Sequence, residues 1–202
     1  MSKKIIIAGT DTDIGKTYIS ALVMQNLGEN SIYIKPIQTG FPEYSDEKFV
    51  KDNVKNCNTQ TIITYKNPAS PHLCAKQENR PIDLEKLILE IDNISANYKI
   101  SVIELAGGLM VPINDDFFNL DLIKNLNCDK IILVARPDLG TLNHTILSIK
   151  ALNSIGIKND KIEVVINFVN NIKTNDIIEE NISFLNKLVK TTVVKYGQKK
   201  DF

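Results

Sequence analysis

Short apolar runs alternate with segments of helical periodicity along most of the chain. The first run covers residues 5–8 and ends at a glycine, which is typical of a short buried strand. Ile19, Leu22 and Val23 follow with helical spacing, and Gly28 offers a stop for that helix. Because strands that alternate with helices form βαβ units, the pattern predicts an α/β fold with a mostly parallel central sheet and helices on both faces.

Later segments repeat this alternation. Further strands are predicted at 31–34, 99–105, 130–135, 161–168 and 192–195. Further helices are predicted at 46–53, from the N-cap Asp83 through Ile91, at about 120–126, at 142–152 and at 176–189. The rest of the polar stretch 38–71 is predicted to be loop, because glycines and prolines punctuate it. No repeat, low-complexity tract or linker divides the chain, so residues 1–202 are predicted to form one domain.

The charge and the cysteine content indicate which classes of partner, and which cellular compartment, are expected for this protein. The 24 basic and 24 acidic residues cancel and are mixed along the chain, so neither nucleic acid nor a membrane is an expected partner. The balanced charge is more consistent with a small-molecule ligand that binds at a local site. The three cysteines have no metal-ligand spacing and are expected to be free thiols in a reducing cytoplasm. No apolar run has the length of a secretory signal or a membrane span, which also predicts a cytoplasmic location.

Four polar features come directly after predicted strands. They are Gly9–Thr17, Lys35–Gly40, Glu104–Gly108 and Asn167. Parallel strands end on the same edge of their sheet, and ligands of such sheets bind outside the carboxyl ends of the strands. We therefore expect the four features to form one site.

The segment Gly9–Thr17 reads GTDTDIGKT and lies between a predicted strand and a predicted helix, which is the setting of a phosphate-binding P-loop. In such a loop backbone N–H groups surround phosphates, Lys16 would reach the β- and γ-phosphates, and the Thr17 hydroxyl would ligate Mg²⁺. Five residues separate the two glycines, where the usual motif has four. The segment predicts a single P-loop NTPase-like domain, but GTPases, kinases, ATPases and ligases all share the motif.

Two further strand ends carry side chains that suit phosphoryl transfer. Lys35 can neutralise charge that develops during the transfer, and Thr39 can donate to a carboxylate or carbamate oxygen. Glu104 can complete the Mg²⁺ shell, and Gly107 lets backbone approach the γ-phosphate or the substrate. Taken alone, Lys35 and Glu104 also fit ordinary solvent-facing charges, and that alternative stays open.

Together these loops resemble the dethiobiotin synthetase family, and the resemblance follows the order and spacing of residues 3–170. The matching positions are Gly9–Thr17, Lys35-Pro36, Thr39-Gly40, Ser45-Asp46, Ser70-Pro71-His72, Arg80-Pro81-Ile82, Glu104, Ala106-Gly107-Gly108, Pro112, Leu139-Gly140, Asn143-His144 and Asn167. The additional residue between the two glycines of the loop is itself a feature of that family.

The resemblance implies a homodimeric enzyme that uses ATP and Mg²⁺ on 7,8-diaminononanoate and CO₂, with the site near the subunit interface. An amine of the substrate would capture CO₂ as a carbamate, and a carbamate oxygen would attack the γ-phosphate. The second amine would attack the mixed anhydride, close the ureido ring and release phosphate. The product would be dethiobiotin, an intermediate of biotin biosynthesis.

The resemblance also implies a role for each matching residue. Catalysis would fall to Lys16, Lys35 and Thr12, and the Mg²⁺ ligands would be Thr17, Asp46 and Glu104. The nucleotide would contact Asp13, Ile14, Gly15, Lys16, Thr17, Tyr18, Asp46, Glu104, Ala106, Gly107 and Asn167, the last of which would read the adenine edge. The substrate would contact Thr12, Lys35 and Thr39, with Gly140 and Asn143 supplied by the other subunit for its carboxylate.

The chain departs from the family at a few positions, and two other functions stay open. Leu105 stands where the family commonly has Gly, Asp13 is often Glu, and no Gly-x-Ile-Pro-type segment follows Lys190. One alternative is another P-loop ATP-dependent ligase that acts on a different small acid. The other is a nucleotide-switched ATPase of the partition type, although those proteins usually carry a second lysine early in the loop and residues 10–14 have none.

Overall fold

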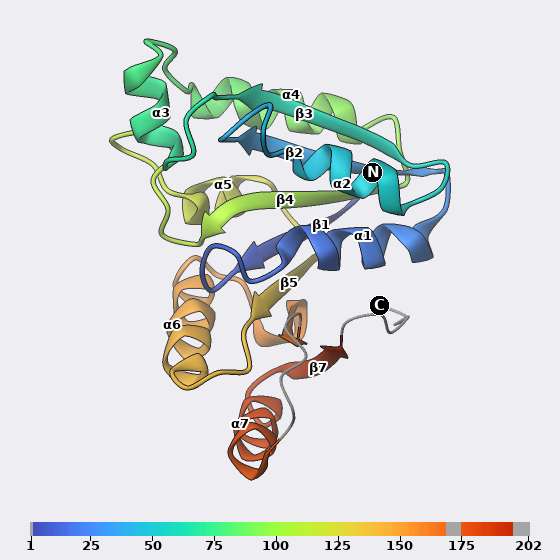
Figure 1. Ribbon diagram of the computed structural model, residues 1–202, viewed down its shortest axis with the longest axis vertical. Helices are drawn as coiled ribbons and strands as arrows, with labels where there is room; N and C mark the ends of the chain where they lie inside the picture. The colour runs from blue at the N-terminus through green and yellow to red at the C-terminus, as the bar shows by residue number, and fades with distance from the viewer. Residues whose placement is uncertain (1, 169–174, 196–202) are drawn as a thin grey trace.

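The core of the molecule is a seven-stranded sheet in which every described pairing is parallel (Figure 1). The structure, a computed structural model, describes residues 2–168 and 175–195. Its strands are β1 (Lys3–Gly9), β2 (Ser31–Gln38), β3 (Asn58–Thr64), β4 (Ile100–Gly108), β5 (Lys130–Ala135), β6 (Ile162–Phe168) and β7 (Lys190–Lys195). Their order across the sheet is β3-β2-β4-β1-β5-β6-β7.

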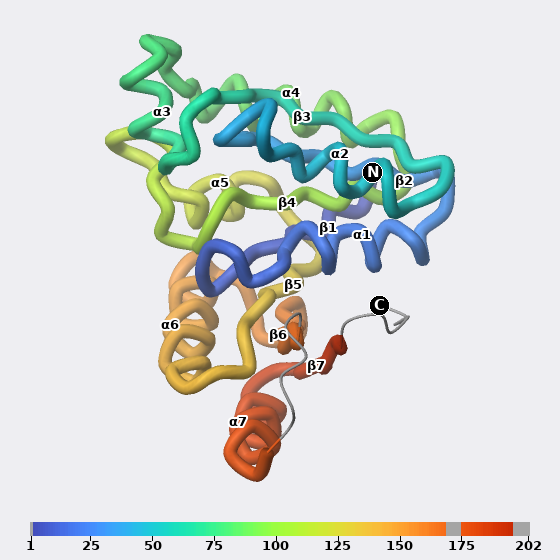
Figure 2. Tube along the Cα trace, viewed as in Figure 1, coloured from blue at the N-terminus to red at the C-terminus, as the bar shows by residue number. Residues whose placement is uncertain are grey.

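Helices cover both faces of this sheet, as Figures 1 and 2 show. They are α1 (Lys16–Leu27), α2 (Asp46–Asn53), α3 (Pro71–Gln77), α4 (Leu84–Ser95), α5 (Asn119–Asn125), α6 (Thr141–Ser154) and α7 (Asp176–Asn186), with a 3₁₀ turn at Asn159–Lys161. α1 and α2 pack on one face, while α4, α5, α6 and α7 contribute to the core on the other. The predicted α/β fold is confirmed. Within the described residues, no helix combines the length and apolarity that a membrane crossing requires.

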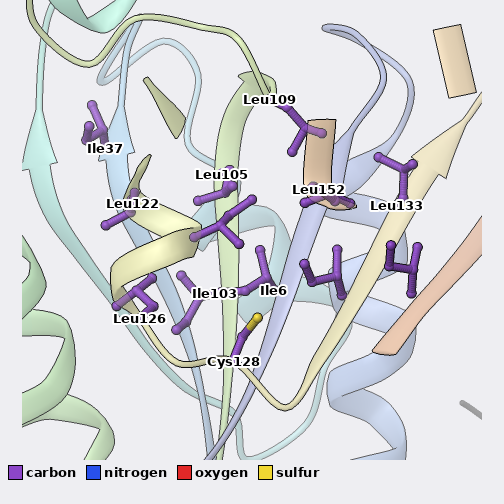
Figure 3. Close-up of a cluster of buried hydrophobic side chains, with 14 of the residues drawn as sticks. Ile6, Ile37, Ile103, Leu105, Leu109, Leu122, Leu126, Cys128, Leu133 and Leu152 are labelled. Atoms are coloured by element: carbon purple, nitrogen blue, oxygen red, sulfur yellow. The ribbon is translucent and has the colours of Figure 1, made fainter. Parts of the chain in front are cut away.

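Successive strand residues enter different cores because side chains alternate across a sheet. Ile6 lies in the larger core with residues from α4 to α7, and Ile7 lies in the smaller core with residues from α1. Figure 3 shows part of the larger core, with Ile6, Ile103 and Leu122 of α5 among its labelled side chains. Burial on both faces explains why the central strands are apolar at almost every position.

The stretch 38–71 differs from its prediction as mostly loop. It contains β3, and α3 begins at its last residue, whereas the short helix at 46–53 was predicted with the right bounds. β3 reads NTQTIIT and, among the described strands, pairs only with β2, so it is an edge strand whose side chains are mostly half-buried. An edge strand tolerates polar residues, and its sequence therefore lacks the apolar run that marked the other strands.

The C-terminal elements differ by smaller amounts. α7 ends at Asn186 rather than at 189, and β7 begins at Lys190 rather than at 192. Two apolar residues misled the prediction, because Leu188 and Val189 continue the helical spacing but both donate their N–H groups to Leu185 O in a turn. Periodicity gives element type more reliably than it gives element ends.

The strands separate at their carboxyl ends. β2 pairs with β4 only as far as Ile34, opposite Ile103. β1 pairs regularly with β4 as far as Ile7, opposite Glu104, and its register then shifts so that Gly9 lies opposite Gly108. Space therefore opens between the ends of three neighbouring strands, at the edge where ligands of parallel sheets bind.

Candidate active site

A cavity of about 770 Å³ lies at this edge of the sheet. Its walls come from the loop after β1, the end of β2, the segments around Asp46 and Ser70, and the end of β4. Three of the four polar features predicted to share one site thus line a single cavity. Asn167 lies outside that lining, but its Nδ2 donates to the carbonyl of Ile14 in the loop after β1, at 2.9 Å.

The loop after β1 folds tightly around its two glycines. A Cβ atom on Gly9 would lie 2.7 Å from Cδ1 of Ile14 and 2.9 Å from the carbonyl of Asp11, so no larger residue fits there. Asp13 and Gly15 both have left-handed backbones, with φ values of 55° and 84°. α1 starts directly after Gly15 without a side-chain cap, which leaves its first N–H groups available to an anion.

Lys16 is the first residue of α1 and is 7% exposed. Its Nζ donates to the carbonyl of Asp11 at 3.1 Å. Burial lowers the pKa of Lys16 from 10.5 to about 8, although Glu104 acts in the opposite direction, and the neighbouring charge of Lys35 lowers it further. Burial therefore outweighs the nearby carboxylates, and an anionic ligand would favour the charged form of this ammonium.

Lys35 lies within β2, where it is 3% exposed, rather than on the loop after it. Its Nζ lies 2.5 Å from Oδ2 of Asp46 and 3.0 Å from Oε1 of Glu104. Burial opposes the charge of Lys35, but these two carboxylates outweigh it and raise the pKa of the lysine. Lys16 and Lys35 come from separate βα units, and both line the cavity.

Glu104 is 1% exposed and accepts hydrogen bonds at both of its oxygens. Oε1 accepts from Thr17 Oγ1 at 2.9 Å, and Oε2 accepts from Ser20 Oγ at 2.8 Å and from Tyr33 OH at 2.9 Å. Burial and the charge of Glu104 raise the pKa of Tyr33 well above its usual value, so Tyr33 remains a neutral donor. Glu104 is therefore a buried, fully partnered carboxylate and not the solvent-facing charge that the sequence had left possible.

Sequence reasoning missed Ser20 and Tyr33. Two spacings could have found them: Ser20 follows Thr17 by one helical turn, and Tyr33 lies on the same face of its strand as Lys35. Gln38 was also missed, and its Oε1 accepts from the N–H of Asp46 at 3.0 Å, which fixes the start of α2 next to the cavity.

The three predicted metal ligands, Thr17, Asp46 and Glu104, come together around the Lys35 ammonium. Burial would raise the pKa of Asp46, but the neighbouring Lys35 ammonium and, to a smaller extent, the Thr17 hydroxyl outweigh burial and lower that pKa. One hydroxyl and two carboxylates are oxygen donors of the type that Mg²⁺ takes when substrate phosphates supply further ligands. The set fits Mg²⁺ even though residues 2–168 and 175–195 contain no group of three or more His, Cys, Asp or Glu suited to a metal.

Thr12, Thr39, Ala106 and Gly107, to which the resemblance gives contacts with substrate or nucleotide, also line the cavity. Gly107 has a φ of 67°, and a Cβ there would lie 2.7 Å from Cγ2 of Val111, which explains the need for glycine.

Leu105, which stands where the family commonly has Gly, does not enter the cavity, because its side chain is buried in the larger core (Figure 3).

Other predicted site residues lie outside the cavity. The Ile14 side chain is buried in the smaller core, so its contact with a nucleotide would have to come from its backbone, and Tyr18 is partly buried against that core. Gly140 and Asn143 begin α6 and do not line the cavity of their own chain. After Lys190, where the sequence lacks a base-holding segment, residues 191–195 belong to β7 and residues 196–202 fall outside the described residues.

Comparison with known proteins agrees with this geometry. A family model described as "AAA domain" matches residues 3–194. The ATP-dependent dethiobiotin synthetase BioD of Methanococcus vannielii is 35% identical over 205 residues, which cover 98% of this chain and 95% of the relative. The protein of the same name from Clostridium kluyveri is 36% identical over 210 residues, with 96% and 85% covered.

Solved structures with lower identity share the fold alone. A ParA family ATPase from Chlorobium tepidum TLS superimposes with a TM-score of 0.61 at 12% identity, covering 100% of this chain and 87% of the other. The MinD cell division protein of Aquifex aeolicus gives a TM-score of 0.55 at 16% identity, with 96% and 82% covered. Both likenesses support a P-loop NTPase-like arrangement of the sheet.

Proposed function

The chain belongs to the dethiobiotin synthetase family, and from that membership we propose how its cavity joins CO₂ to a diamine. The protein is an ATP-dependent ligase of biotin biosynthesis that closes the ureido ring of dethiobiotin. The observation that carries the proposed mechanism is the position of Lys16 and Lys35, two buried lysines that face one cavity from separate βα units.

The reaction would proceed in three steps within this cavity. One amine of 7,8-diaminononanoate captures CO₂ as a carbamate, and a carbamate oxygen attacks the γ-phosphate of ATP with release of ADP. The second amine then attacks the carbonyl carbon of the resulting mixed anhydride, which closes the ring and releases phosphate. Lys16 and Lys35 hold the γ-phosphate and the carbamate while negative charge moves between them. Phosphoryl transfer depends mainly on such positioning and charge neutralisation, so the chemistry needs no strong protein base. Thr12 and Thr39 line the same cavity and can donate to the carbamate.

Thr17, Asp46 and Glu104 would hold Mg²⁺ in this proposal. The ion, when bound, supplies positive charge that neutralises the phosphate oxygens. Asp46 and Glu104 also hold the Lys35 ammonium, at 2.5 and 3.0 Å, and thereby keep the lysine charged at the reacting end of the cavity.

Asn167 would read the adenine of ATP. Its Nδ2 is occupied by the Ile14 carbonyl, while its Oδ1 is buried and has no hydrogen-bond partner within the described part of the chain. A buried acceptor without a partner is costly, and the amino group of adenine would supply the missing donor.

We also propose that the enzyme is a cytoplasmic homodimer. The three cysteines are free, which suits a reducing compartment. Gly140 and Asn143 lie outside the cavity of their own chain, and the neighbouring Leu139 is 95% exposed. A second subunit can bring the start of α6 to the open side of the cavity, where its N-terminal amides would receive the substrate carboxylate.

Two experiments test these proposals. The first incubates the purified chain with MgATP, ¹³C-bicarbonate and 7,8-diaminononanoate, and we expect mass spectrometry to show labelled dethiobiotin with one ADP per ring. ATP turnover that does not depend on the diamine would favour a partition-type ATPase instead.

The second experiment tests the shared site. Lys16→Gln and Asn143→Ala homodimers are each expected to have little activity, whereas subunit exchange between them rebuilds one intact site in mixed dimers. Recovery of activity on mixing supports the proposal. A mixture no more active than its parents contradicts the contribution of α6 from a second subunit.

A further inference from the structure

Arg136, which directly follows β5, contacts the phosphate loop from the neighbouring strand. Its Nη2 donates to Oδ2 of Asp11 at 2.5 Å. The two backbones are also joined nearby, because the N–H of Thr10 donates to the carbonyl of Val134 at 3.0 Å. The end of β5 thus holds the loop at two points, one through the main chain and one through the guanidinium.

Asp11 connects this guanidinium to the catalytic side of the loop. Its Oδ1 accepts from the N–H of Thr12 at 2.8 Å, and its carbonyl accepts from Lys16 Nζ at 3.1 Å. Two residues further on, Asp13 has a φ of 55°, a backbone conformation that persists only where the surroundings enforce it. The ion pair with Arg136 is one such constraint on the loop.

The stability of the fold does not account for this pair. The Arg136 side chain is 38% exposed and that of Asp11 is 50% exposed, and pairs with this exposure contribute little to folding. The Nε of Arg136 is moreover buried without a partner among the described residues, which costs stability. Arg136 is also one of only two arginines in a chain that uses lysine at its other basic positions.

We propose that Arg136 is a positioning residue for the phosphate loop. It fixes Asp11, whose carbonyl in turn orients the Lys16 ammonium, and it offsets the Asp11 charge that would otherwise repel a polyphosphate. Arginine suits this task because its planar guanidinium holds a carboxylate in one geometry, whereas lysine supplies only charge. The inference rests on the proposed function, since it assumes that Lys16 receives the phosphates of ATP.

The test compares Arg136→Met and Arg136→Lys with the matched control Lys86→Met. Lys86 forms an exposed pair with Asp83 at the start of α4, 3.4 Å long, with side chains 83% and 49% exposed, and neither residue lines the cavity. Calorimetry gives the Kd of ADP and of a non-hydrolysable ATP analogue, and steady-state kinetics give kcat and KM. Neither Kd depends on the diamine, so loop positioning can be tested even if ring closure fails.

We expect Arg136→Met to raise the nucleotide Kd and to lower kcat, each about tenfold, while KM for the diamine stays within about twofold. Arg136→Lys should restore most of the nucleotide affinity but little of kcat, because charge returns without the planar geometry. The melting temperature should fall by less than about 3 °C in both variants. Lys86→Met should match the wild type throughout.

A double-mutant cycle with Asp11→Asn shows whether Arg136 acts through Asp11. In the Asp11→Asn background, Arg136→Met should change the nucleotide Kd by less than about threefold, because its partner charge has already gone. The inference is overturned if the two substitutions are additive, if Arg136→Met keeps both kcat and Kd within twofold of the wild type, or if Lys86→Met reproduces the losses.

Discussion

Two buried glutamates on the same sheet have very different surroundings. Glu104 is 1% exposed and lies in the middle of β4, in the last regular pair of that strand with β1, and Glu163 is 3% exposed and lies near the amino end of β6. Each is paired with lysine: Glu104 with Lys35 at 3.0 Å, and Glu163 with Lys130 at 2.7 Å and with Lys190 at 3.0 Å. Buried carboxylate–lysine pairing is therefore common to both and does not by itself mark the active site.

The two glutamates differ in their hydrogen-bond partners and in whether they line the cavity, and this difference indicates which of them can act in catalysis. Glu104 accepts hydrogen bonds from the hydroxyls of Thr17 and Ser20 in α1, and it lines the cavity. Its hydrogen bonds and ion pair therefore connect the helix that follows the phosphate loop to Lys35. Glu163 is held by lysines of the neighbouring strands and by Thr192, whose hydroxyl donates at 2.6 Å, and it lines no part of that cavity. A buried charge can act on a ligand only where it lines the cavity at the carboxyl-end edge of the sheet, as Glu104 does and Glu163 does not.

Glu104 with its partners forms one cluster of charged and polar side chains, and Glu163 with its partners forms another. The largest expected difference between these two clusters is in the effect of a substitution on kcat. Lys35→Gln should lower kcat by about 10²–10³-fold, because it removes a positive charge from the transferring phosphoryl group. Lys130→Gln removes the equivalent partner of Glu163 and should leave kcat within about twofold of the wild type. Ring closure measured for both variants checks the contrast, and equal losses would show that both clusters serve only the fold.

A second difference should appear in the pH dependence of nucleotide binding. Lys16 has a pKa of about 8, lowered mainly by burial, and a bound phosphate favours its charged form. Above pH 8 the binding of nucleotide must therefore take up a proton, so the Kd of a non-hydrolysable ATP analogue should rise up to about tenfold per pH unit. Calorimetry between pH 7 and 9.5 measures this rise.

The control for that measurement is Lys16→Arg, which stays charged across the range and should give a much flatter curve. Glu163→Gln should keep the wild-type slope, because its cluster lies away from the cavity. A wild-type Kd that does not change above pH 8 would contradict the assigned state of Lys16.

A third difference concerns stability rather than turnover. Glu163→Gln leaves Lys130 and Lys190 without their carboxylate, and we expect a loss of about 1–2 kcal/mol, or roughly 3–6 °C in melting temperature, with kcat unchanged. The loss is limited because solvent reaches both lysines, which are 29% and 68% exposed. Thermal unfolding at pH 7 measures it, and an unchanged melting temperature would show that the cluster is energetically neutral.

The smallest expected effect is the change, at acid pH, in what the Glu163 carboxylate contributes to the stability of the fold. Burial alone would raise the pKa of Glu163, but hydrogen bonds from Lys130 and Thr192 together lower it below its usual 4.5. A lowered carboxyl pKa stabilises the fold above the unfolded pKa, and that contribution is lost as pH falls through the folded value. The difference in melting temperature between wild type and Glu163→Gln should therefore shrink as pH falls below about 4.5. A difference that grows in acid would contradict the ion pairing.

Local sequence patterns could predict the fold class and the loops that line the cavity, but not how side chains meet across it. The phosphate loop and Lys35 were visible because glycine spacing and strand-end position are properties of short segments. Tyr33 and Arg136 were missed because each acquires its role only when strands distant in sequence become neighbours. β3 was missed for a similar reason, since its place at the edge of the sheet permits a polar sequence.

The backbone of Lys35 is part of a paired strand, because it lies opposite Thr61 of β3. Its Cα is therefore fixed before any ligand arrives, and only the torsions of the aliphatic arm remain to be set. No segment of main chain has to become ordered before the Lys35 ammonium contacts a ligand, so moving the ammonium to that ligand costs little conformational entropy. The motion of this lysine should therefore not be the slow event of a catalytic cycle in this molecule.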